Sequence, residues 1–295
     1  MSDNDLSFGF ELQPTGDDGS TFRYRNLPNE YQRSTVVDRR TSIKSNLSVQ
    51  GSLVTVVHGK FAPGGPRATL IVARLELMSS HHCRRFSSAK ISFHFRNNKK
   101  FLNSSVHKIA PSGEIALNQS WYRLEKKVSA GGGGGLGIHS LAADVQAKYE
   151  LTKALVRPDC GSLYGSTTTE GRSFGPKNTA RWSMSQNESE KSGIPTHLYL
   201  AILLKRDNDE PFFADVKVNA EVDVLYKLES WIQDVGGKNK IDPIKFDPRK
   251  PPMGVIPNGL DKDNLSEYPL ERLGRVETTP SIDTRASAPH SYDLL

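Results

Sequence analysis

The sequence predicts an all-β protein folded as an antiparallel β-sandwich, with a barrel as the alternative. Three observations support this class. Apolar and polar residues alternate with a period of two in several segments, turn-forming residues bound these segments, and few stretches show a helical period. The clearest alternation covers residues 212–224, where Phe212, Ala214 and Val216 alternate with neighbours such as Lys217. Such a strand has one buried face and one largely solvated face.

The other predicted strands follow the same reasoning in chain order. Each is rich in Val, Ile, Leu or aromatic residues, which favour strands. Asp207, Asp209 and Glu210 read as a hairpin turn before the last strand rather than as a cation site. His58, near the end of an apolar strand, is expected to be a hydrogen-bonded core histidine. Trp121, Trp182 and Trp231 are expected to fill the core or rim. The remaining predicted strands are residues 52–58, 68–77, 86–95, 178–186 and 198–205.

Residues 144–151 carry an ambiguous pattern. Apolar residues from Val145 to Leu151 alternate with charged or polar ones, as in a strand, whereas Leu141, Val145 and Tyr149 also suit a helix. We expect a strand, because four consecutive pairs obey the alternation.

The glycine run at residues 131–135, with Gly137, formally matches the dinucleotide-binding pattern G-x-G-x-x-G. The preceding segment is a poor buried strand, and Ile138 stands where a phosphate loop would require Lys. We therefore expect a flexible linker or hairpin loop rather than a phosphate site.

The two ends of the chain differ in composition from its centre. Residues 1–46 are polar and lack a sustained period, so they predict a largely disordered N-terminal arm. Residues 47–231 form the predicted sandwich domain. Residues 232–295 are rich in Pro, which removes backbone donors, and predict an extended or disordered C-terminal tail with a short helix near residues 266–273. Both arms are expected to be flexible.

Two groups of short motifs resemble a known set of sequences. The first is the run at residues 51–59 with Ala68-Thr69-Leu70 and residues 84–89, and the second is residues 178–182 with residues 191–196 and 203–206. Together they are similar to an uncharacterised β-rich family of predicted proteins from filamentous fungi, over about residues 48–257. The resemblance implies one β-rich unit of fungal type. It implies no assigned activity and no catalytic residue.

The sequence predicts no catalytic residue, cofactor or metal site. The G-x-S-x-G and H-E-x-x-H motifs are absent. His81, His82 and Cys83 are adjacent, whereas zinc requires ligands that converge from separate elements. Cys160 is expected to be a buried or loop thiol without a catalytic role. Enzymatic activity stays open, although the sequence favours its absence.

Basic residues concentrate in residues 84–127. This segment holds ten Lys or Arg residues against Glu114 and Glu125, which gives it a net charge of +8. The net charge of the whole chain of 295 residues is only +6. Basic residues interleaved with aromatic ones can bind phosphates and stacked bases, although a solvated face balanced by acids near residues 207–234 explains the pattern as well. The candidate nucleic-acid contacts are Arg84, Arg85, Lys90, Arg96, Lys99, Lys100 and Lys108.

Ser42 is a candidate phosphorylation site. It follows Arg39-Arg40-Thr41, which matches the R-R-x-S pattern of basophilic kinases, within the predicted N-terminal arm. A phosphate there would add about two negative charges beside two arginines.

The sequence carries no signal peptide, lipidation motif or long apolar run, so we expect a soluble cytoplasmic protein without a membrane partner. Strong sheet patterning without convergent reactive groups predicts a non-enzymatic protein-interaction or scaffold protein that binds a protein partner or self-associates. Sheet edges would allow binding by strand addition. The alternative is a nucleic-acid-binding or coat-like protein that uses the basic segment.

Overall fold

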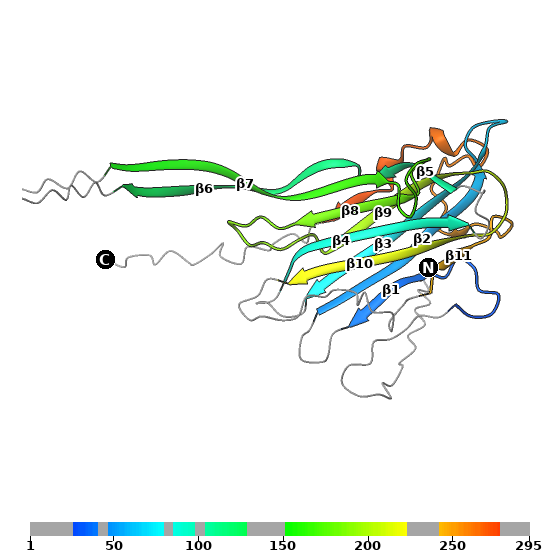
Figure 1. The fold of residues 1–295 in the computed structure, drawn as a ribbon, viewed down its shortest axis with the longest axis horizontal. Helices are drawn as coiled ribbons and strands as arrows, with labels where there is room; N and C mark the ends of the chain where they lie inside the picture. Colours follow the sequence, from blue (N-terminus) through cyan, green and yellow to red (C-terminus); the bar gives the residue numbers. More distant parts are fainter. Residues whose placement is uncertain are drawn as a thin grey trace, which may run out of the picture.

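The computed structural model shows two antiparallel β-sheets packed face to face (Figure 1). It describes residues 26–40, 47–79, 85–97, 104–128, 151–222 and 242–277. The regular elements of these residues are strands, together with two short 3-10 helices, η1 (Leu265–Glu267) and η2 (Leu270–Arg272). Within the described chain neither sheet closes on itself, so the predicted all-β sandwich is confirmed.

Sheet A is built around three long central strands. The first two of them pair from Leu47↔Ser79 to Lys60↔Arg67, and a bulge lies between Leu53 and Thr55. Sheet A consists, in order, of β1 (Thr35–Arg40), β2 (Leu47–Lys60), β3 (Arg67–Ser79), β9 (His197–Arg206) and β13 (Arg275–Glu277), with β12 (Met253–Gly254) paired to β2 and β5 (Ser104–Ala110) paired to β9.

Sheet B has a simple strand order and ends in its longest strands. Its central pairing runs from Phe212↔Asn97 to Val222↔Phe86. Sheet B consists, in order, of β11 (Ile244–Phe246), β10 (Phe212–Val222), β4 (Phe86–Asn97), β8 (Thr179–Ser185), β7 (Leu151–Thr168) and β6 (Gly113–Val128).

The main core lies between the two sheets. Alternate residues of facing strands fill it, including Ile71 of β3 and Ile91 and Phe93 of β4. Trp182 of β8 is buried there, and its Nε1–H donates a hydrogen bond of 2.8 Å to the carbonyl oxygen of Pro111. Trp182 therefore fills the core as predicted, whereas the side chains of Trp121 and Trp231 fall outside the described part.

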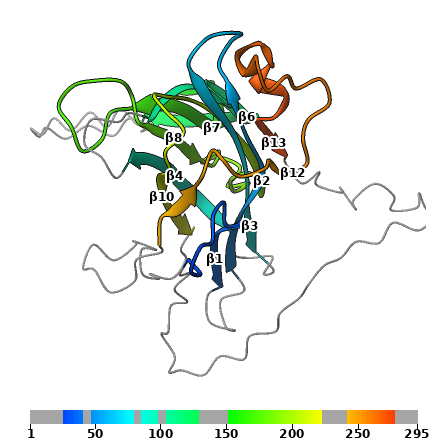
Figure 2. The ribbon, with the colours of Figure 1, turned by 90° about the vertical axis from the view of Figure 1, so that its right-hand side faces the viewer.

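The middle of sheet A is buried on its outer face as well. Leu70 and Leu203 belong to a second apolar cluster, which also contains Leu265 and Leu270 from the C-terminal segment. Figure 2 shows this segment lying across the outer side of sheet A near β2 and β13. Two-sided burial explains why β3 and β9 read as nearly continuous apolar runs instead of strict alternations.

The C-terminal segment approaches sheet A at backbone contact. The Lys60 N–H donates to the carbonyl oxygen of Lys262 at 2.7 Å. A Cβ atom at Gly59 would lie only 2.0 Å from the same oxygen, so any side chain at this position would push the segment away.

The observed elements extend past the boundaries that the sequence predicts. The six predicted strands correspond to β2, β3, β4, β8, β9 and β10, with ends shifted by a few residues. Strand β1 joins sheet A before residue 47, and residues 244–277 add strands to both sheets beyond residue 231. Near residues 266–273 the chain forms η1 and η2 instead of one helix. Apolar positions in the C-terminal segment are widely spaced, so periodicity did not reveal their burial.

Replacing Leu270 with Ala tests whether the C-terminal segment belongs to the folded unit. Leu270 is 1% exposed, so the variant should lose about 2 to 4 kcal/mol of the free energy of unfolding, measured by urea denaturation. Val255→Ala is the matched control, because Val255 is 76% exposed and should change stability by about 0.5 kcal/mol or less. Equal midpoints for the two variants would contradict this packing.

Candidate interaction site at the base of the hairpin

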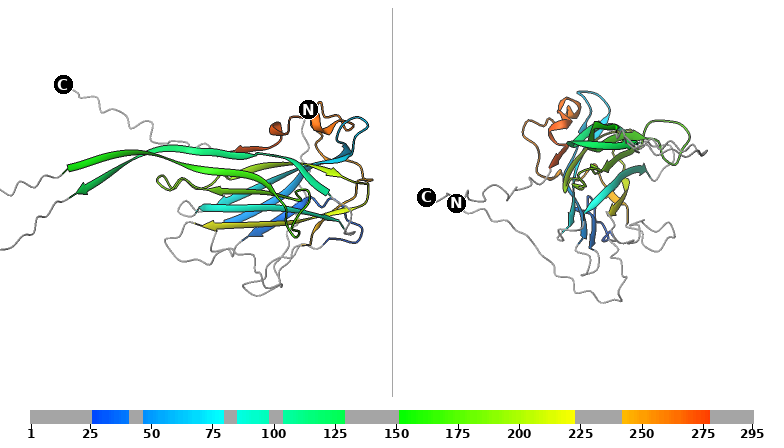
Figure 3. Two further views of the ribbon diagram at one scale, coloured as in Figure 1. Left: turned by 45° about the horizontal axis from the view of Figure 1, so that its top comes forward. Right: turned by 90° about the vertical axis from the view of Figure 1, so that its left-hand side faces the viewer.

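Strands β6 and β7 form a hairpin that projects from the sandwich (Figures 1 and 3). They pair from Gly113↔Gly165 to Val128↔Leu151. Strand β8 pairs with β7 only up to Ser162↔Ser185. The nine β6–β7 pairs from Ser120↔Asp159 to Val128↔Leu151 therefore lie beyond the last pairing with β8, as a two-stranded ribbon.

A β-bulge marks the point where the ribbon leaves the sandwich. The β6–β7 register shifts between Leu117 and Ser120. Within this bulge Asn118 has a φ of 46°, in the left-handed region that Asn tolerates better than most residues. Opposite the bulge, a Cβ atom on Gly161 would lie 3.0 Å from the carbonyl oxygen of Ser185. Close backbone approach thus favours glycine at this position of β7.

The side chain of Asn187 connects this bulge to the loop that follows β8. Asn187 is fully buried. The two hydrogens of its Nδ2 group are shared among three acceptors, the carbonyl oxygen of Asn118 at 2.8 Å, Ser120 Oγ at 2.8 Å and the carbonyl oxygen of Asp159 at 3.0 Å. Its Oδ1 atom accepts from the N–H groups of Ser189 and Glu190, both at 3.0 Å, and from Ser189 Oγ at 2.8 Å.

Asp159 adds a second connection between the loop and β7. Its carboxylate accepts hydrogen bonds from the N–H groups of Ser189, at 2.8 Å, and Cys160, at 2.9 Å. The bond from Ser189 is the main reason why the pKa of Asp159 lies below its usual value. Cys160 itself is exposed on strand β7, which corrects the expectation of a buried or loop thiol. In an antiparallel edge region such as this one, alternate side chains point away from the core.

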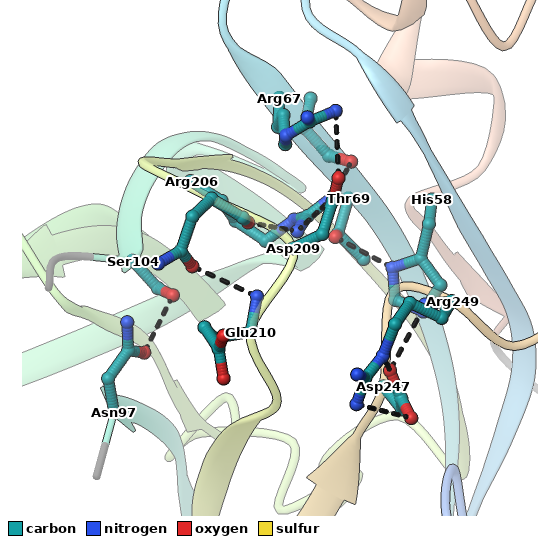
Figure 4. Close-up of polar contacts among 12 residues, drawn as sticks. His58, Arg67, Thr69, Asn97, Ser104, Arg206, Asp209, Glu210, Asp247 and Arg249 are labelled. Atoms are coloured by element: carbon teal, nitrogen blue, oxygen red, sulfur yellow. Dashed lines mark hydrogen bonds and ion pairs between the residues drawn. The ribbon is translucent and has the colours of Figure 1, made fainter. Parts of the chain in front are cut away.

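A separate polar cluster lies at the other end of the sandwich (Figure 4). One of its buried members, Arg206, donates to the carbonyl oxygens of Asn208 and Ala68 and to the carboxylate of Asp209. Asp209 also pairs with Arg67 at 2.8 Å. These contacts fix the turn between β9 and β10 at residues 207–210. A turn forms there as predicted, but it is not the turn of a hairpin, because β9 belongs to sheet A and β10 to sheet B.

His58 lies in this cluster and is held on both ring nitrogens. Nδ1 lies 2.9 Å from Thr69 Oγ1, and Nε2 lies 2.6 Å from the Gln32 side-chain nitrogen. Since the amide nitrogen can only donate, Nε2 accepts and the proton resides on Nδ1. Burial, followed by the positive charge on Arg206, lowers the pKa of His58 to about 4. His58 is therefore hydrogen-bonded as predicted, but its side chain is half-buried and lies outside the apolar core.

This polar cluster has the features of a structural network. Thr69, the hydroxyl beside His58, has no exposed surface, so a substrate could not reach it without rearrangement. Both carboxylate oxygens of Asp247 accept hydrogen bonds from the Arg249 guanidinium, so Asp247 forms an ion pair within the protein. Among the described residues, no group of three His, Cys, Asp or Glu side chains is arranged to hold a metal ion.

The predicted nucleic-acid contacts that fall within the described residues lie on more than one surface. Arg96 pairs with Asp215 on the outer face of sheet B at 2.7 Å, and Lys108 pairs with Glu271 beside sheet A at 2.8 Å. Lys90 is exposed on β4. Arg85 precedes this strand, and a Cβ atom added at Gly193 would lie 3.4 Å from its side chain. Arg84, Lys99 and Lys100 lie outside the described residues. Contact with nucleic acid stays a prediction.

Several other predicted features fall outside the described residues. They are Ser42, the His81-His82-Cys83 group, the glycine run at residues 131–135, and residues 144–150 of the ambiguous segment. Leu151, the last residue of that segment, begins strand β7.

Sequence reasoning missed the projecting hairpin and the role of Asn187. One signal pointed to the hairpin, because the predicted hairpin loop at residues 131–135 lies between Arg123-Leu124-Glu125 and the alternating segment near Leu151. Local patterning gave no comparable signal for Asn187, whose partner Asn118 is 69 residues away.

Comparison with known proteins gives no family assignment. No family model and no curated protein matches the chain. Among solved structures, it is similar to the NetB toxin of Clostridium perfringens in the membrane inserted form, with 8% identity over 64% of this chain and 84% of the toxin, at a TM-score of 0.26. It is also similar to the delta-toxin of Clostridium perfringens, with 12% identity over 77% and 89% of the two chains, also at 0.26. TM-scores this low do not establish a common fold, and the fungal resemblance stays a prediction.

Helices η1 and η2 have three residues each, and the described chain holds no helix of the length and apolarity needed to span a membrane.

The pH dependence of stability tests the environment of His58. Its pKa is about 4 when folded and near 6.5 when unfolded, so between these values the unfolded chain binds more protons. The contribution of His58 to the free energy of unfolding is complete above pH 6.5. It is lost as the pH falls toward 4, and the total loss is about 3 kcal/mol. The difference between wild type and His58→Gln in the free energy of unfolding should shrink over this range. A difference that stays constant with pH would contradict the assignment.

Proposed function

We propose that this protein is a non-enzymatic interaction or scaffold protein that self-associates edge to edge through its β6–β7 hairpin. The support is the unequal length of the strands that end the two sheets. Strands β1, β13 and β11 have six, three and three residues, whereas β6 has 16. Proteins commonly shorten their edge strands because a long edge offers unpaired N–H and C=O groups to other chains.

The ribbon beyond Ser120 and Asp159 has two such edges. Along Ser120 to Val128, strand β6 pairs only with β7 among the described residues. Along Leu151 to Asp159, strand β7 in turn pairs only with β6. A two-stranded ribbon is marginally stable in water, and addition of further strands stabilises it. Pairing with another copy would supply these strands and satisfy the backbone groups of both edges.

The two edges belong to different strands, which sets the symmetry of the assembly. If the β6 edge of one copy pairs with the β7 edge of the next, the contact is head to tail. Such contacts form a closed ring when the rotation between copies closes and an open fibre when it does not.

Charge on the hairpin opposes this pairing at low salt. Residues 121–128 and 151–158 contain Arg123, Lys126, Lys127, Lys153 and Arg157 against Glu125. Like charges on neighbouring strands destabilise a sheet, and salt screens them. Self-association should therefore strengthen as the salt concentration rises. Binding of nucleic acid has the opposite salt dependence, so the same titration separates the two functions.

A hairpin deletion tests the proposal. Ser120 and Asp159 are direct cross-strand partners, so an Asn-Gly turn can join them and replace residues 121–158. Wild type should sediment as an oligomer at high salt, and this variant should sediment as a monomer at every concentration. Its urea midpoint should stay close to that of wild type, because the sandwich remains.

A shorter deletion is the matched control. Val128 and Leu151 are also direct partners, so an Asn-Gly turn can replace residues 129–150 while both ribbon edges remain. This variant should still self-associate, and a monomer here would contradict a role for the edges.

All three proteins are also sedimented with phosphatidylcholine vesicles, because an apolar strand face such as that predicted by Val145, Ala147 and Tyr149 can also be covered by lipid. Vesicle binding by a chain that stays monomeric would overturn the proposal.

A further inference from the structure

Three chain segments meet where the hairpin leaves the sandwich. They are the bulge of β6 near Asn118, the point of β7 near Asp159, and residues 186–190, which follow β8. We propose that residues 186–190 act as a clasp that holds the hairpin to the sandwich, with Asn187 as its positioning residue.

The Asn187 side chain has two halves with different partners. Among the described residues, its Oδ1 atom accepts from Ser189 and Glu190, so this half shapes the clasp loop itself. In the same part of the chain, the acceptors of its Nδ2 group belong to Asn118, Ser120 and Asp159, so this half connects the loop to both hairpin strands. A side-chain amide carries two N–H donors and a carbonyl acceptor. A carboxylate has no donor and a hydroxyl has one, so neither can replace it here.

The clasp is in turn anchored to the body of the sandwich. The Gln186 N–H donates to the carbonyl oxygen of Ser87 at 2.8 Å. Beyond the end of the clasp, the Ile194 N–H donates to the carbonyl oxygen of Phe86 at 3.0 Å. Both acceptors belong to β4, a central strand of sheet B. The hydrogen bonds of Asn187 therefore connect the hairpin to a rigid element of the sheet.

The clasp lies at the point where the hairpin loses its pairing with β8. Pairing between β7 and β8 ends at Ser162↔Ser185, and the clasp contacts Asp159 and Ser120 immediately beyond this pair. No strand of the described chain other than β6 and β7 pairs with the ribbon farther out. The clasp is thus placed to fix the direction in which the ribbon leaves the sheet. Its effect on assembly rests on the proposed self-association, whereas its effect on hairpin order does not.

Asn187→Asp separates the two halves of the side chain. The carboxylate still accepts from Ser189 and Glu190, but it cannot donate to the carbonyl oxygens of Asn118 and Asp159 and is repelled by them. Asn219→Asp is the matched control, because Asn219 is exposed on β10 and the charge change is the same.

Hydrogen exchange measured by mass spectrometry is the test, with sedimentation in parallel. In Asn187→Asp, amide exchange in residues 120–128 and 151–159 should rise about tenfold or more, and exchange in β3 and β9 should match wild type. Asn219→Asp should resemble wild type throughout. Hairpin exchange within about twofold of wild type would overturn the clasp.

Sedimentation distinguishes failure of the clasp from failure of the proposed function. Faster hairpin exchange in Asn187→Asp together with weaker self-association supports both. Faster exchange while wild type is monomeric under every condition supports the clasp and overturns the proposed self-association. If Asn187→Asp does not fold, the double variant Ser120→Ala with Ser189→Ala is used instead. It removes the Ser120 Oγ contacts with Asn187 and Ser189 and the bond from Ser189 Oγ to Asn187, and its hairpin exchange should rise by about threefold. Unchanged exchange in that variant would also count against the clasp.

Discussion

Burial of sheet A on both faces is the constraint on which the rest of the structure depends. Its inner face meets sheet B through residues such as Ile71, and its outer face carries Leu70 and Leu203. An apolar outer face in water would be unfavourable, and Leu265 and Leu270 cover it. The C-terminal segment is held there by apolar burial and by backbone hydrogen bonds such as that from Lys60 to Lys262. This cover gives the sandwich three layers along part of its length.

Sheet B faces a different problem, because its last two strands are longer than their neighbours. Strand β8 ends at Ser185, whereas β7 continues as far as Leu151, so the ribbon loses its third strand partway along. The polar groups released at this junction are satisfied by Asn187 and Asp159. Farther out, β6 and β7 pair only with each other among the described residues, and their open outer edges are the basis of the proposed self-association. The sandwich and the ribbon are therefore connected at this junction by the hydrogen bonds of Asn187 and Asp159.

Sequence reasoning succeeded where one face of a strand is buried and failed where contacts are distant in the chain. Strand β10 alternates cleanly because its outer residues, such as Lys217, stay solvated, so its existence and its inner face were predictable. Strand β6 was not predicted, because residues such as Arg123 and Lys126 interrupt its apolar pattern. The environment of His58 was partly predictable: an apolar strand indicated a core histidine, but its partner Gln32 lies in the predicted N-terminal arm.

The sequence by itself determined the all-β class, the central strands of both sheets and the inward face of most of them. These features follow from a period of two, which depends only on neighbouring residues. Only the tertiary structure decided that residues 244–277 add strands to both sheets, that β6 pairs with β7 alone among the described strands, and that Asn187 joins the hairpin to the sandwich. The physical reason is that each of these depends on contacts between segments far apart in the chain, and local periodicity carries no information about which distant segments meet.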